Sequence, residues 1–237
     1  MFKKTSKVVK YASEIPSYQA IVPTKRVIPN WYKNTPKHLK NHIPFKLPFQ
    51  RSFKACTPFL EALTVGYVLT TLCDIGIDNT TETDTVVTWN KELNFDPVGH
   101  RSSDFIKLNQ NIPIPTGFSS QHFVWHTQSV YTIPKGYSVL VTHPLNRFDL
   151  PFLTLSGVID GYMTVHTGNI PVFFNKTFNG IIPRGTPYAQ LVFFKTEDWN
   201  SKEDSSILKE EKSNQVLTRA IAEGWYKASY WRKKMYN

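Results

Sequence analysis

Residues 133–149 read Ile-Pro-Lys-Gly-Tyr-Ser-Val-Leu-Val-Thr-His-Pro-Leu-Asn-Arg-Phe-Asp, and this run decides the fold class. Its β-branched, apolar centre predicts a strand over 137–143, and Gly136 after Pro134 favours a turn with a positive φ. Runs of the same texture, punctuated by Pro, Gly and Asn, predict further strands at 67–72, 75–77, 85–89, 129–133, 151–158, 162–167, 170–174, 180–182 and 188–195. A spacing of about eight to twelve residues without helical periods between the runs predicts a mainly β barrel or sandwich.

Two segments of different character flank this core. Residues 1–58 are punctuated by prolines, which exclude long helices and favour an extended arm with at most short helices over 31–40 and after Pro58. After Trp199 the apolar residues fall in helical spacing. We therefore expect three parts: a basic Pro-rich arm (1–58), a β core (59–198) and a helical, basic and aromatic tail (199–237).

The net charge of +10 is concentrated at the two ends of the chain. Residues 1–54 hold 12 Lys or Arg and one acid, whereas residues 55–201 hold eight basic and 12 acidic residues. A basic arm beside a mildly acidic core suits an anionic partner: nucleic acid, a phosphate-bearing ligand or an acidic protein surface. The alternative is a solubilising arm whose aromatic residues, such as Trp31 and Tyr32, dock on the body or on a neighbouring subunit.

Several classes of protein are excluded or disfavoured by composition. Cys56 and Cys73 are too few for a disulfide framework, and no apolar stretch approaches the roughly 18 residues of a membrane helix. The first ten residues are basic but lack the apolar core of a secretory signal. Walker, dinucleotide-binding and Gly-x-Ser-x-Gly motifs are absent from the sequence. We therefore expect no membrane insertion, no resident cofactor and a cytoplasmic location.

Four motifs occur in a fixed order across residues 131–194. They are Pro134-Lys-Gly136, Arg147, Gly157-Val-Ile-Asp160 and Ala189-Gln190-Leu-Val. Together they resemble the dUTPase and dCTP deaminase superfamily, whose fold is the β-clip. The resemblance implies a dUTPase-like β-clip core and a homotrimer. By position it implies Asp160 as general base, and the nucleotide-binding residues Arg147, Gly157, Tyr162, Arg184 and Gln190, with Tyr162 packing against the sugar.

The sequence departs from this pattern where phosphates would bind. Phe148 follows Arg147 in place of a serine, and Gly185-Thr186-Pro187 replaces a Gly-Asp-Arg turn. The Gly-rich closing arm of the enzymes is also absent. These replacements remove hydrogen-bond donors and a positive charge, so we expect weaker binding of a triphosphate. The segments Thr-His-Pro-Leu-Asn-Arg and Thr-Leu-Ser-Gly-Val also resemble an uncharacterised protein family found in bacteria and their phages. A virion location is therefore the alternative to the cytoplasm.

Three functions follow as hypotheses. The first is a non-catalytic β-clip module, structural or accessory in a phage. The second is a nucleotide hydrolase or deaminase that uses Asp160 as base, with Mg²⁺ if it is a hydrolase; otherwise Asp160 is a turn residue and Tyr162 packs in the fold. The third is a metal-dependent β-barrel enzyme in which His122, His126 and His143 bind zinc or iron, with His166 or Asp160 as further ligands. Dispersed histidines are equally typical of hydrogen-bonded core or surface positions.

Overall fold

The computed structural model describes residues 7–13, 15, 21–40, 49–80, 84–90, 93–101, 113–160, 164–165, 169–220 and 225–237. Every strand pairing among them is antiparallel. The largest sheet has five strands in the order β13 (Gly157–Asp160), β11 (Tyr137–Thr142), β17 (Pro187–Lys195), β5 (Tyr67–Thr70) and β2 (Ile21–Pro23). A four-stranded sheet has the order β12 (Phe152–Thr154), β15 (Asn169–Phe174), β9 (Phe123–His126) and β8 (Val98–His100).

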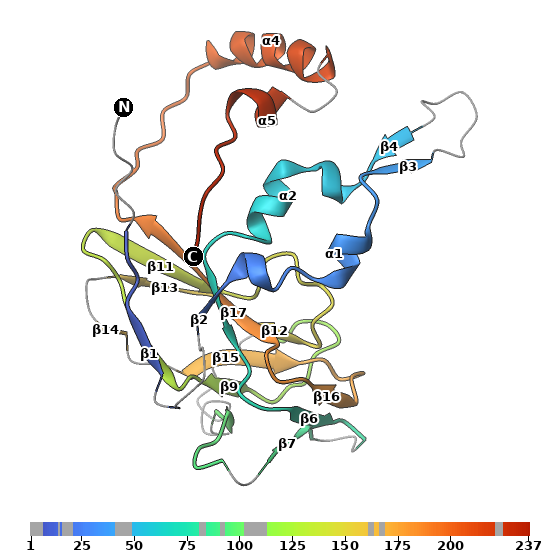
Figure 1. Cartoon of the computed structure of the whole chain (residues 1–237), viewed down its shortest axis with the longest axis vertical. Coiled ribbons are helices and arrows are strands. Elements are labelled where there is room, and N and C mark those ends of the chain that lie inside the picture. The colour runs from blue at the N-terminus through green and yellow to red at the C-terminus, as the bar shows by residue number, and fades with distance from the viewer. Residues whose placement is uncertain are drawn as a thin grey trace.

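Smaller sheets and short helices complete the described chain (Figure 1). One three-stranded sheet joins β1 (Tyr11–Ser13), β10 (Ser129–Thr132) and β14 (Thr164–Val165), and another joins β16 (Gly180–Ile182), β6 (Ile75–Asp78) and β7 (Val86–Trp89). A separate hairpin pairs β3 (His38–Lys40) with β4 (Phe49–Arg51). The helices are α1 (Asn30–Asn34), α2 (Thr57–Ala62), α4 (Ile207–Ala220) and α5 (Trp225–Ser229), with 3-10 turns at Thr24–Arg26 and Phe53–Ala55.

The hydrophobic core lies between the two larger sheets. Buried Leu69 and Leu191 of the five-stranded sheet share one cluster with Trp125 and Phe152 of the four-stranded sheet. The Trp125 indole N–H donates to Thr154 Oγ1 at 3.1 Å, and that hydroxyl donates to the Tyr188 carbonyl at 2.6 Å. The aromatic core is therefore anchored by polar contacts that need no water.

The mainly β prediction is confirmed, and most predicted strands are observed within one or two residues of their expected bounds. Gly136 has φ of 77°, as its turn requires. The predicted strand 151–158 is in fact two strands. Thr154 pairs with Val172 in one sheet and Gly157 with Val141 in the other, so the chain crosses between sheets at this point. The predicted strand 162–167 overlaps β14 only at 164–165; its other residues lie outside the described part.

The expected arm is not separate from the body over residues 21–35. Strand β2 pairs with β5 at the edge of the five-stranded sheet, and Ile21 and Tyr32 are buried. The predicted helix over 31–40 ends at Asn34, because Thr35 precedes Pro36 and adopts extended backbone. Residues 38–40 form a strand instead. Part of the expected arm is therefore packed against the β core.

The predicted helical tail contains the two helices α4 and α5, at the end of the molecule opposite β6 and β7 (Figure 1). The C-terminal tail, residues 225–237, docks on α2: the Trp231 indole donates to Glu61 at 2.8 Å and Lys234 pairs with the same carboxylate. The aromatic residue Trp231 of the tail is thus packed against the body. Within the described part of the chain, no helix has the length and apolarity needed to cross a bilayer.

Candidate functional site

The loop between β11 and β12 carries Arg147, the first predicted phosphate ligand. Its Nε and Nη2 each donate to the Asp149 carboxylate at 2.9 Å, and Nη1 donates to the Val27 carbonyl at 3.4 Å. The Arg147 side chain is only 12% exposed. Burial alone would raise the pKa of Asp149, but hydrogen bonds from Arg147 and Trp31 hold it below its usual value. The guanidinium is thus already neutralised by a bidentate partner from its own loop.

Gln190, the second predicted ligand, is a structural residue in this fold. It is 1% exposed, and its Nε2 donates to the carbonyls of Ala62 and Val65 at 3.1 and 2.8 Å. Its Oε1 accepts the backbone N–H of Leu145 at 2.8 Å. Both amide protons and the amide oxygen are used to join the end of α2 to the loop of Arg147. Contact with a nucleotide would require these bonds to break.

Arg147 and Arg184 line one cleft of about 370 Å³. The backbone N–H of Arg184 donates to Asp74 at 2.7 Å, which fixes the turn before β17. Its exposed guanidinium has no hydrogen-bond or ion-pair partner among the described residues. Arg184 is therefore the cation of this cleft whose side chain remains open to an anion; its role in binding a nucleotide stays a prediction.

A second, more apolar cavity of about 280 Å³ lies beside Gly157. Val141, Ile159 and Ile170 contribute to its walls. No described atom lies within 4 Å of the position that a Gly157 Cβ would occupy, so packing does not require glycine there. The cavity and the cleft share no lining residue.

Two polar groups that the sequence did not single out also line this cavity. The buried Thr127 hydroxyl has no hydrogen-bond partner within the described part of the chain. Burial raises the pKa of the Tyr131 phenol to about 12. Neither residue belongs to a recognisable motif, so sequence reasoning had no signal by which to find them.

Asp160, the predicted base, is the last residue of β13 and is exposed. It pairs with Ser138, whereas Gln190 pairs with Thr142 at the other end of the same strand β11. Four residues of strand correspond to about 13 Å. Within one chain, the predicted base and the predicted phosphate-binding residues therefore lie at opposite ends of β11. Tyr162 lies outside the described residues.

The histidines expected to bind a metal occupy separate structural positions. His143 uses both ring nitrogens: Nε2 bonds the Arg147 carbonyl at 3.1 Å, and Nδ1 accepts the Thr154 N–H at 3.3 Å. The His126 Nδ1 bonds the Asp96 carbonyl at 2.8 Å, and the His122 ring packs against Phe173. Burial lowers the pKa of both His122 and His143.

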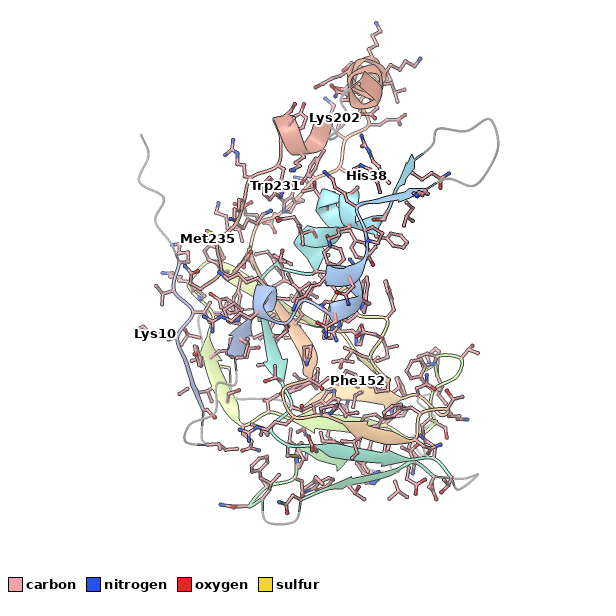
Figure 2. The ribbon with its side chains drawn as sticks, turned by 45° about the vertical axis from the view of Figure 1, so that its right-hand side comes forward. Lys10, His38, Phe152, Lys202, Trp231 and Met235 are labelled. Carbon is pink, nitrogen blue, oxygen red and sulfur yellow. The ribbon has the colours of Figure 1, made fainter. Side chains whose placement is uncertain are left out.

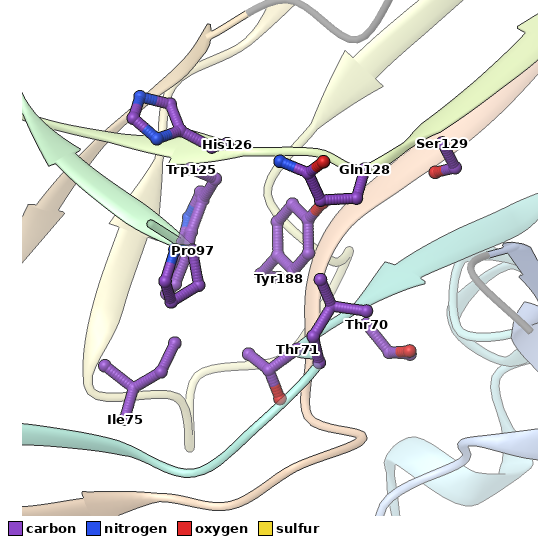
Figure 3. Close-up of a pocket in the computed structure, with 10 residues that line it drawn as sticks. Thr70, Thr71, Ile75, Pro97, Trp125, His126, Gln128, Ser129 and Tyr188 are labelled. Carbon is purple, nitrogen blue, oxygen red and sulfur yellow. The ribbon is translucent and has the colours of Figure 1, made fainter. Parts of the chain in front are cut away.

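No group of three His, Cys, Asp or Glu side chains within the described ranges is placed to hold a metal. The expected zinc or iron site is therefore not assembled there, and His166 lies outside those ranges. Figure 3 shows His126 at the edge of a small pocket that Trp125 and Tyr188 also line. Its volume of about 10 Å³ holds at most one water.

No protein-family model and no curated protein matches this chain. The resemblance to the β-clip enzymes therefore stays an expectation, and function has to be inferred from the geometry of the cleft, the cavity and the surface.

Proposed function

We propose that this protein is a non-catalytic β-clip module that binds or assembles with other macromolecules, as a structural or accessory component of a phage. The observation that carries this proposal is the internal use of Arg147 and Gln190. Hydrogen bonds to charged groups contribute about 1.5–3 kcal/mol each, so a phosphate would gain little by displacing Asp149 from Arg147. The separation of Asp160 from these residues also supports a non-catalytic role.

Exposed apolar side chains support the assembly role. Phe148 is 82% exposed beside the cleft, and Ile181, which lines the cleft, is 64% exposed. We take these two exposed apolar side chains as part of a surface that a partner covers. We propose that the partner is another copy of the chain in a closed homotrimer, the symmetry that the β-clip resemblance implies.

The test combines assembly state, location and activity. Native mass measurement should give a trimer, purified virions should contain the protein, and deoxynucleotides should be neither hydrolysed nor deaminated. A monomer that is absent from particles would overturn the assembly proposal.

The second candidate is a nucleotide hydrolase or deaminase. Two observations favour it: the open space at Gly157 beside a cavity, and the exposed guanidinium of Arg184, which has no partner in the part of the chain that the structure describes. Asp160 would act as base and, in a trimer, would meet the cleft of a neighbouring subunit; a hydrolase would bring Mg²⁺ with its triphosphate. Turnover that disappears in Asp160→Asn but persists in Asp198→Asn, an exposed aspartate elsewhere, would establish this candidate. The metal-dependent alternative has no observation in its favour among the described residues.

A further inference from the structure

Two stretches of the chain are rich in Lys and Arg and contain no acidic residue. Residues 15–60 hold eight Lys or Arg and no Asp or Glu, and residues 225–237 hold four Lys or Arg and again no acid. The intervening body has more acids than bases. An imbalance this sharp produces a one-sided positive potential wherever the two stretches lie together.

The fold brings these two stretches to the same end of the molecule. The C-terminal tail docks on α2 through Trp231, and Lys25 Nζ donates to Asn237 Oδ1 at 3.0 Å. Figure 2 shows Trp231 and His38 on the upper side, with Phe152 in the sheets below. Glu61, the first acid after the basic run, is occupied by Trp231 and Lys234. Its negative charge is therefore already paired within the docked C-terminal tail.

The hairpin β3–β4 projects from this basic end (Figure 1). Its register sets Arg51 opposite His38, so His38, Lys40 and Arg51 share one face of the two-stranded ribbon. The three side chains of β3 and the neighbouring Lys37 are all exposed. Lys37 and Lys40 have no ion-pair partner among the described residues. The base of the hairpin is closed by the Ser52 N–H, which donates to the Lys37 carbonyl at 3.1 Å.

We propose that the β3–β4 hairpin, through His38, Lys40 and Arg51 with Lys37 beside them, binds the phosphodiester backbone of nucleic acid. A two-stranded ribbon fits the major groove of duplex DNA, which is about 12 Å wide, and lysines without internal partners can replace the counterions of phosphates. Beside the hairpin, Phe53 is 69% exposed and stacks on Phe59, which offers a ring face to an unpaired base. A membrane surface is a poorer fit, because such binding needs a broad apolar face and Leu39 is the one aliphatic residue in these two strands.

The experiment compares two double charge reversals that change net charge equally. Lys37→Glu with Lys40→Glu alters the hairpin, and Lys135→Glu with Lys176→Glu alters exposed lysines in turns of the sheet body. Binding of the full chain to a labelled DNA duplex and to single-stranded oligothymidine is measured by anisotropy over a range of salt. Loss of two phosphate contacts should weaken duplex binding about 60-fold at about 100 mM salt and reduce the salt slope by about 1.8. Lys40→Gln alone should weaken it about 8-fold.

The proposal is supported if the wild type binds DNA, the hairpin variant shows this loss of affinity, and the affinity of the control variant changes less than threefold. The probe that binds more tightly shows whether the site takes duplex or single-stranded DNA. Equal losses in both variants would show a response to net charge alone and would overturn it. So would an absence of DNA binding at low salt, or binding to phosphatidylserine vesicles in its place. Thermal melting followed by circular dichroism checks that the variants fold. If the melting temperature of the hairpin double variant alone is lowered, the milder Lys40→Gln variant decides the test.

Discussion

Replacing Gln190 by methionine removes one buried amide while keeping nearly the same volume. The change leaves three backbone groups without their partners: the Leu145 N–H and the carbonyls of Ala62 and Val65. Each net hydrogen bond contributes about 0.5–1.5 kcal/mol and each buried unsatisfied group costs about 1–3 kcal/mol, so we expect a loss of about 3–5 kcal/mol. That is a large share of the roughly 5–15 kcal/mol that stabilises a typical domain.

Urea unfolding followed by circular dichroism measures this loss. The midpoint should fall while the slope of free energy against urea stays unchanged, because the exposed surface is the same. Gln50→Met, at an exposed position in β4, is the matched control and should change stability by less than about 0.5 kcal/mol. A loss below about 1 kcal/mol for Gln190→Met would refute the structural role of this amide.

The pH dependence of the stability of Gln190→Glu provides a second test of the same role. A carboxylate at this position accepts from Leu145 but cannot donate to the two carbonyls, and burial raises its pKa in the folded state. A group with a raised folded pKa contributes stability below its unfolded pKa, about 4.3 for glutamate, and loses it as pH rises. The variant should therefore approach wild-type stability near pH 4 and fall away from it at neutral pH. A penalty independent of pH would contradict this reasoning.

Three other outcomes are expected. Gly66→Ala should lower the free energy of unfolding in urea by about 2–5 kcal/mol, because φ is 71° and a methyl group would overlap the Leu191 carbonyl. Gly136→Ala, which has open space around it, should lower it by only about 1–2 kcal/mol. Burial lowers the pKa of His143 in the folded state, so stability should fall as pH drops below about 6.5, and His143→Gln should flatten that fall; an unchanged pH profile would contradict the assignment. Glu61→Ala should release the C-terminal tail and speed its cleavage by trypsin about 5- to 30-fold, and an unchanged rate would show that these contacts do not hold it.

The strands of the core were predictable because each carries its own signal. The run 137–143 is β-branched and bounded by Gly136 and Pro144, and it forms β11 nearly as expected. Strand β2 was missed because Ile21-Val-Pro is short and lies among prolines; only its pairing with β5, distant in sequence, makes it a strand. Local pattern describes an element well when neighbouring residues decide it, and poorly when a remote partner does.

The candidate site shows the same limit. The sequence motifs drew attention to Arg147 and Gln190 as candidate ligands. They gave no information about which groups these two side chains contact. The Asp149 that neutralises Arg147 stands only two residues away and was visible in the sequence. The carbonyls that Gln190 binds belong to residues more than 120 positions earlier, so no local pattern reveals them. Thr127 and Tyr131 came together at the cavity through strand packing alone.

The central claim is that Arg147 and Gln190 serve the fold rather than a nucleotide. Calorimetric titration of dUTP and dCTP, with Mg²⁺, into the native assembly tests it most directly. We predict no saturable heat for either nucleotide at millimolar concentration. Saturable binding at micromolar concentration that is lost in Arg147→Lys, with the variant still folded, would contradict the claim.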